Sequence, residues 1–110
     1  MIDWDRVSSL REEVGPEDFE EVVELFLDEV DEEIGGLLDL ETTDSIIEKL
    51  HFLKGSALNL GFSDFSRLCQ AGETALSKDA SEPIDLHSVK SSYHASREYF
   101  LEYLPNRMAG

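Results

Sequence analysis

The sequence predicts an all-α fold, an up-down-up-down antiparallel four-helix bundle with a short additional N-terminal helix. Apolar residues recur at three- and four-residue steps in every segment, and strand-like alternation is missing. The connections between the helical segments are short, which favours antiparallel neighbours. A chain of 110 residues with 41% hydrophobic residues is long enough to bury one core, so we expect residues 1–110 to form a single domain.

Two helices are expected in the N-terminal part, at about residues 3–13 and 16–38. Trp4 is expected to anchor the first of them. Pro16 suits the first turn of the second, because its missing N–H would be unpaired there in any case. The second helix is predicted to bury one apolar stripe, formed by Phe19, Val23, Phe26, Val30, Ile34 and Leu37.

A third long segment, about residues 43–60, has clear start and stop signals. Several N-cap candidates lie between Thr42 and Ser45, and Ser45 and Glu48 have the spacing of a capping box. Gly61 is suited to a left-handed residue at the end of the helix.

Two further helices complete the bundle. One is expected to begin at Ser63 or Asp64, and the last is expected to end before Pro105. Cys69 lies on an apolar stripe and is interpreted as a small core residue. The two stripes contain Phe65, Leu68, Cys69, Gly72 and Leu76, and then Leu86, Val89, Tyr93, Phe100 and Tyr103.

The charge is strongly negative and unevenly distributed. The formal net charge is −16, and residues 1–48 contain 18 acids and 2 bases, whereas residues 49–110 contain 7 of each. Such a balance argues against nucleic acids, whose phosphates would be repelled, and against anionic membrane surfaces. The single cysteine, the absence of a secretory signal and the lack of an apolar run of about 20 residues lead us to expect a cytoplasmic protein.

One exposed position on the 43–60 helix stands out. Helical periodicity places Leu50 and Leu53 toward the core and His51 nearly opposite, facing solvent. Lys54 and Gly55 follow one turn later, and glycine in a helix interior costs roughly 1 kcal/mol relative to alanine. A neutral imidazole is a competent nucleophile, and a nearby cation would stabilise a phosphoryl group attached to it.

The stretch HFLKGSALNLG, residues 51–61, resembles the H-x-x-K-G-[SA]-x-x-x-x-G signature of histidine-containing phosphotransfer (HPt) domains. The resemblance covers essentially the whole chain and implies a four-helix bundle. It implies that His51 is phosphorylated and that Lys54 steadies the phosphoryl oxygens. Glu73 falls where similar domains have Glu or Gln bonded to the imidazole. Many relatives have alanine where this chain has Leu50, which should alter only packing.

The resemblance also indicates how partners would reach the site. Gly55 matches the glycine that lets a partner approach, and Ser56 matches the small residue after it. Leu58 shares the face of His51 and is a further candidate for docking. The implied partners are receiver domains of response regulators, a hybrid sensor histidine kinase, or both.

The implied function is that of a phosphoryl carrier in a multistep His–Asp phosphorelay. The phosphoryl group would pass between His51 and aspartates of receiver domains, or come from a kinase. The chain has no glycine-rich nucleotide loop, so we expect neither ATPase nor autokinase activity of its own. We expect no cofactor bound by this chain, Mg²⁺ on the partner receiver, and a monomer.

Two alternatives belong to other classes. The first is a non-phosphorylated helical adaptor that binds receiver domains without relaying. The second is a metal-binding bundle, because Glu48 and His51 form the E-x-x-H spacing of di-iron carboxylate proteins. That architecture needs a second such pair, and neither His87 nor His94 has a glutamate three residues before it. We therefore expect no metal, and both of these histidines solvated.

Overall fold

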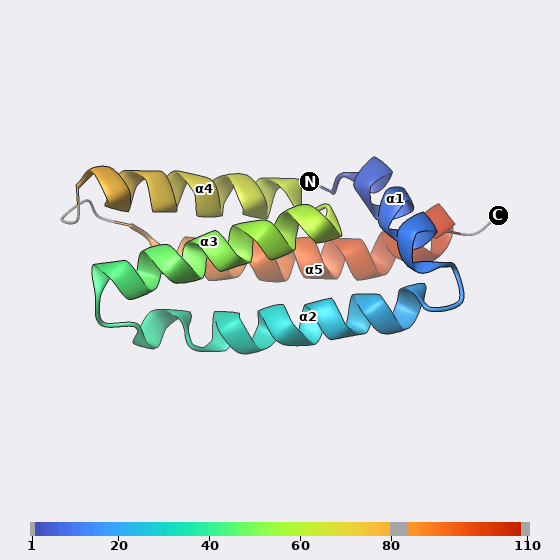
Figure 1. The fold of residues 1–110 in the computed structure, drawn as a ribbon, viewed down its shortest axis with the longest axis horizontal. Helices are drawn as coiled ribbons and strands as arrows, with labels where there is room; N and C mark the ends of the chain where they lie inside the picture. The colour runs from blue at the N-terminus through green and yellow to red at the C-terminus, as the bar shows by residue number, and fades with distance from the viewer. Residues whose placement is uncertain (1, 80–83, 109–110) are drawn as a thin grey trace.

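The computed structural model describes residues 2–79 and 84–108, and within them it confirms the all-α class. Helices α2 to α5 lie along one another, and each runs opposite to the one before, while α1 packs at one end (Figure 1). Among the described residues there is no strand, only an isolated bridge between Ile2 and Phe62. The elements are α1 (Trp4–Val14), α2 (Phe19–Gly35), the 3-10 turn η1 (Leu37–Asp39), α3 (Thr43–Leu60), α4 (Ser63–Lys78) and α5 (Leu86–Met108).

All five helices contribute to one apolar core. Its aromatic centre joins the α3–α4 turn to α5, with ring centroids of Phe62 and Phe100 5.3 Å apart and those of Phe65 and Tyr93 5.4 Å apart. The Tyr93 hydroxyl donates to Asp31 Oδ1 of α2 at 2.6 Å, which ties α5 to α2. The buried hydrophobic residues are Val7, Leu10, Phe19, Val23, Leu27, Val30, Ile34, Leu37, Leu50, Leu53, Ala57, Leu60, Phe62, Phe65, Cys69, Leu76, Val89, Tyr93 and Phe100.

Helix α2 is shorter than the predicted 16–38. Pro16 lies in a turn before it, because the Asp18 N–H bonds to the Gly15 carbonyl at 3.1 Å and delays the helix until Phe19. At the other end, the tighter turn η1 begins one residue after Gly36. The predicted stripe was also wrong at one position: Leu27 is buried, and Phe26 lies at the edge of the core.

Helix α5 continues through Pro105 to Met108, so its predicted end was wrong. A proline in the last turn removes one backbone hydrogen bond. Packing against α1 compensates: Trp4 stacks on Phe100 with centroids 5.9 Å apart, and the Arg107 guanidinium lies 5.2 Å from the Trp4 ring centroid. Tyr103, predicted as a stripe residue, is 42% exposed.

Helix α3 has the predicted bounds, and its N-cap is Thr42, one of the predicted candidates. The Ser45 N–H donates to Thr42 Oγ1 at 3.1 Å. At the other end Gly61 has φ +79°, and a Cβ there would lie 2.6 Å from the Asp3 carbonyl oxygen. Only glycine suits this position, which also accepts a 2.7 Å hydrogen bond from the Asp3 N–H and so fixes the N-terminal segment to the α3–α4 turn.

Candidate functional site

His51 lies on the solvent face of α3. Its side chain is 67% exposed, whereas its neighbour Leu50 and Leu53 are completely buried. This difference in exposure follows from helical periodicity, since residues three apart, such as Leu50 and Leu53, share a face of the helix and adjacent residues do not. The core therefore fixes the helix firmly while leaving the imidazole open to a second molecule.

The imidazole is bonded to a carboxylate from the next helix. Glu73 Oε1 of α4 lies 3.0 Å from His51 Nδ1, and the Glu73 side chain is only 19% exposed. A carboxylate at this distance favours the tautomer in which Nδ1 carries the proton and donates it. The lone pair is then on Nε2, the ring nitrogen that does not contact Glu73.

The same carboxylate also pairs with Lys54. Lys54 Nζ lies 3.3 Å from Glu73 Oε2, so one carboxylate contacts the imidazole through one oxygen and the cation through the other. Lys54 Nζ also donates to Gln70 Oε1 of α4 at 2.8 Å. The lysine is thus held by two groups of α4, and its side chain is 20% exposed.

A glycine lets α4 approach closely enough for these contacts. Gly72 is buried, and a Cβ at this position would lie 3.0 Å from Leu50 Cδ1 of α3. Glu73 follows it directly in the chain. The close packing of the two helices at Gly72 therefore brings the carboxylate to His51.

The proposed docking residues lie on the exposed side of α3. Around Gly55 the described residues leave open space, with nothing within 4 Å of an added Cβ. Leu58 is 56% exposed, and Ser56 is half-buried. Since packing explains Gly72 but not Gly55, the cost of glycine at position 55 has no compensation within the described part of the domain.

The other candidates from the sequence are not bonded to this group. His87 and His94 are exposed on α5. Cys69 is completely buried, and desolvation, with the Glu73 charge second, raises its pKa to about 12. A thiol with such a pKa holds almost no thiolate near neutral pH and is unreactive.

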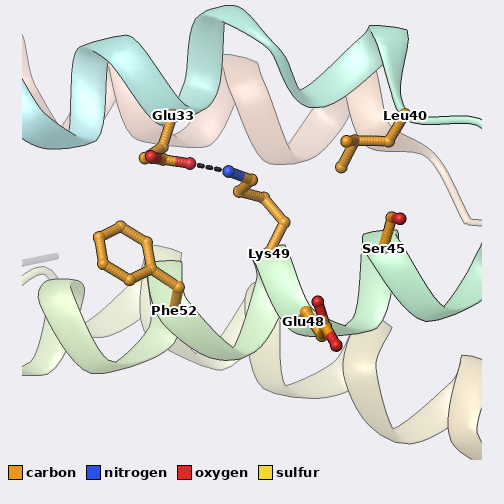
Figure 2. A pocket seen from close by; sticks show the side chains of 6 residues that line it. All are labelled: Glu33, Leu40, Ser45, Glu48, Lys49 and Phe52. Carbon is orange, nitrogen blue, oxygen red and sulfur yellow. Dashed lines mark ion pairs between the residues drawn. The ribbon is translucent and has the colours of Figure 1, made fainter.

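A pocket of about 380 Å³ lies on the other side of α3, between this helix and the end of α2. Figure 2 shows Lys49 reaching from α3 toward Glu33 of α2, with which it forms an ion pair. Glu73 reaches His51 from α4, so this pocket is separate from the His51 site. It is lined by Glu33, Leu40, Ser45, Glu48, Lys49 and Phe52.

Neither a candidate metal site nor a membrane-spanning helix occurs among the described residues. Residues 2–79 and 84–108 contain no group of three or more His, Cys, Asp or Glu side chains placed to hold a metal ion. The carboxylate in contact with His51 is Glu73, not the Glu48 of the E-x-x-H pair. Within the same residues, no helix is both long and apolar enough to cross a membrane.

An exposed imidazole bonded to a carboxylate and one turn from a cation is an arrangement suited to a nucleophilic histidine on a helical bundle. A family model described as Hpt domain matches residues 21–107. The chain belongs to the Hpt domain family, whose members transfer phosphoryl groups through histidine in phosphorelays and are carriers, not kinases. Hpt domains generally interact with receiver domains and kinases. Comparisons with curated proteins and with solved structures give no match.

Of the six candidate site residues predicted from the sequence, three, His51, Lys54 and Glu73, form one connected group. Two contacts of this group were not foreseen: the ion pair between Lys54 and Glu73 and the hydrogen bond from Lys54 to Gln70. The signal for the second was present, because Gln70 is three residues before Glu73 and so shares its face of α4.

Proposed function

We propose that His51 Nε2 accepts the phosphoryl group carried by this Hpt domain. The observation that supports this most directly is the exposed imidazole with its Nδ1 bonded to the Glu73 carboxylate at 3.0 Å. The Nε2 lone pair forms the new N–P bond as the bond from phosphorus to the donor aspartate oxygen breaks, and the aspartate leaves as a carboxylate. The imidazole then carries one added positive charge.

Glu73 and Lys54 stabilise different parts of that product. The Glu73 carboxylate faces Nδ1–H and therefore stabilises the positive charge that the ring acquires. Lys54 is one turn beyond His51, and its ammonium is the cation available to the phosphoryl oxygens. Because the two side chains form an ion pair, removing either one also changes the environment of the other.

We further propose that receiver domains dock over Gly55, Ser56 and Leu58. The open space at Gly55 and the exposure of Leu58 support this surface. The receiver would bring Mg²⁺, and a hybrid sensor kinase is the other candidate partner. The proposal takes the chain as a monomer acting in the cytoplasm, in keeping with a single cysteine that has no second cysteine to pair with.

The proposed domain comprises residues 1–110, although the family match begins at residue 21. Helix α1 precedes the matched region and contributes Val7 and Leu10 to the common core. A receiver-binding adaptor without phosphoryl transfer is the second candidate. The carboxylate bonded to the exposed imidazole favours the carrier, because an adaptor has no need of an oriented nucleophile.

The test is labelling by a panel of phosphorylated receiver domains. His51→Gln should abolish acid-labile label on this chain while leaving its melting temperature nearly unchanged, because the side chain is 67% exposed. His87→Gln and His94→Gln are matched controls and should be labelled at the native rate. Receiver binding without label on the native chain would favour the adaptor, and label persisting in His51→Gln would move the site elsewhere.

A further inference from the structure

We infer that Gln70 is a positioning residue for phosphoryl transfer, acting through Lys54 and itself oriented by Thr74. The inference rests on the proposed function of His51. The added element is a pair of neutral side chains on α4, Gln70 and Thr74. They hold the Lys54 ammonium in place without neutralising its charge.

The hydrogen bonds around Gln70 define which way its amide points. Gln70 Nε2 donates to Thr74 Oγ1 at 2.8 Å, one turn further along α4. The amide oxygen is then the end that faces Lys54, and it accepts from Lys54 Nζ at 2.8 Å. Since an amide has its donors on one side and its acceptor on the other, the contact with Thr74 favours the orientation that the lysine needs.

Lysine needs such a partner more than most side chains do. Its four-carbon stem is flexible, and ordering it costs conformational entropy. Glu73 Oε2 pairs with the ammonium at 3.3 Å, yet this oxygen is buried and has no hydrogen bond among the described residues. The hydrogen bond to Gln70, which is exposed, is shorter at 2.8 Å and gives Nζ a second partner on α4.

The neutrality of the Gln70 side chain also matters, because it leaves the net charge of the group unchanged. Lys54 and Glu73 have opposite unit charges, so with a neutral imidazole the group has no net charge. A carboxylate at position 70 would keep an acceptor for Lys54 but would leave the group net negative before the phosphoryl dianion arrives. An amide accepts the same hydrogen bond without that repulsion.

The experiment uses the whole chain and a donor that requires no receiver. Potassium phosphoramidate, a small N–P phosphoryl donor, labels the histidine, and the lifetime of phosphorylated His51 is then followed by ³¹P NMR. The variants are Gln70→Leu, Gln70→Glu, Lys54→Met and the double variant Lys54→Met with Gln70→Leu. Lys78→Leu, an exposed change about two turns further along α4, is the matched control.

Losing one hydrogen bond to the ammonium should shorten the lifetime in Gln70→Leu by about two- to tenfold. Gln70→Glu should shorten it as well, although a partner for Lys54 remains. In the Lys54→Met background Gln70→Leu should have no further effect, because Gln70 acts through the lysine. Lys78→Leu should keep the native lifetime.

Thr74 provides an independent check. Thr74→Val has nearly the same shape but no acceptor for Gln70 Nε2, so it should shorten the lifetime, and Thr74→Ser should restore it. A native lifetime in Gln70→Leu, or additive effects in the double variant, would overturn the role of Gln70 while leaving His51 as the site. Label on His51→Gln would instead overturn the proposed function.

Discussion

Substitutions of Gly55 should affect the stability of the domain and its binding to a receiver domain in opposite directions. Glycine costs roughly 1 kcal/mol relative to alanine in a helix interior. An added Cβ at position 55 meets no described atom within 4 Å, so no steric penalty opposes this gain. Gly55→Ala should therefore raise the free energy of unfolding by about 1 kcal/mol.

The expected change in melting temperature follows from the size of the chain. The unfolding entropy is about 2 cal/mol/K per residue, so for 110 residues 1 kcal/mol corresponds to a rise of about 4 °C. Gly55→Gln should also stabilise the domain, since glutamine is a good helix former and position 55 is exposed. Thermal unfolding followed by circular dichroism measures both variants.

Phosphoryl transfer should respond in the opposite direction. The methyl group of alanine should slow single-turnover transfer from a phosphorylated receiver only slightly, whereas the long glutamine side chain should obstruct docking and slow transfer at least about tenfold, equivalent to about 1.4 kcal/mol. Labelling by phosphoramidate needs no docking and should be native in both variants.

Gly72→Ala is the matched comparison, because its Cβ would lie 3.0 Å from Leu50 Cδ1. It should gain less stability than Gly55→Ala, or lose some. A Gly55→Gln variant that is stable and accepts phosphoryl groups from receivers at the native rate would refute the docking role. A less stable Gly55→Ala variant would refute the packing argument.

Three further predictions concern neighbouring features. Glu73→Gln keeps an acceptor for Nδ1–H and should slow single-turnover transfer less than Glu73→Ala, which has no acceptor, although both variants lose the ion pair with Lys54; equal rates for Glu73→Ala and the native chain would make Glu73 a surface acid only. Gly61→Ala should cost at least about 1–2 kcal/mol of stability in urea unfolding, because φ is +79° and its Cβ would lie 2.6 Å from the Asp3 carbonyl oxygen. Burial raises the Cys69 pKa from 9.0 to about 12, so the folded chain keeps a proton that the unfolded chain loses in this range. Stability should therefore fall as the pH rises from 9 to 12, and fall less steeply in Cys69→Ala, as alkaline unfolding curves would show.

The helices could be predicted because their apolar periodicity is strong, and α3 was placed well because Gly61 ends it. The start of α2 could not, since nothing local distinguishes Pro16 in a first turn from Pro16 in the turn that precedes Phe19. The end of α5 depends on Trp4, about a hundred residues earlier in the chain. Such tertiary contacts override local signals and leave no trace in a short window of sequence.

The site could be predicted within helix α3 but not across the contact between α3 and α4. Exposure of His51 follows from periodicity within one helix, and the motif indicates its neighbours. The sharing of the Glu73 carboxylate between His51 and Lys54, and the contact with Gln70, depend on the register between α3 and α4. That register depends on close packing at Gly72, a distance that the sequence does not contain.

The unequal distribution of acids has a consequence for how partners arrive. Residues 1–48, which include α1 and α2, have a net charge of −16, equal to that of the whole chain, and α2 and α4 lie on opposite sides of α3 in Figure 1. The molecule is therefore an electric dipole across its short dimension, about 21–22 Å, with α2 at the negative pole and the His51 site nearer the other. An acidic partner at low salt would be turned toward the α4 side before contact. At physiological ionic strength the screening length is about 8 Å, so this orienting field would fade and association would depend on contact alone.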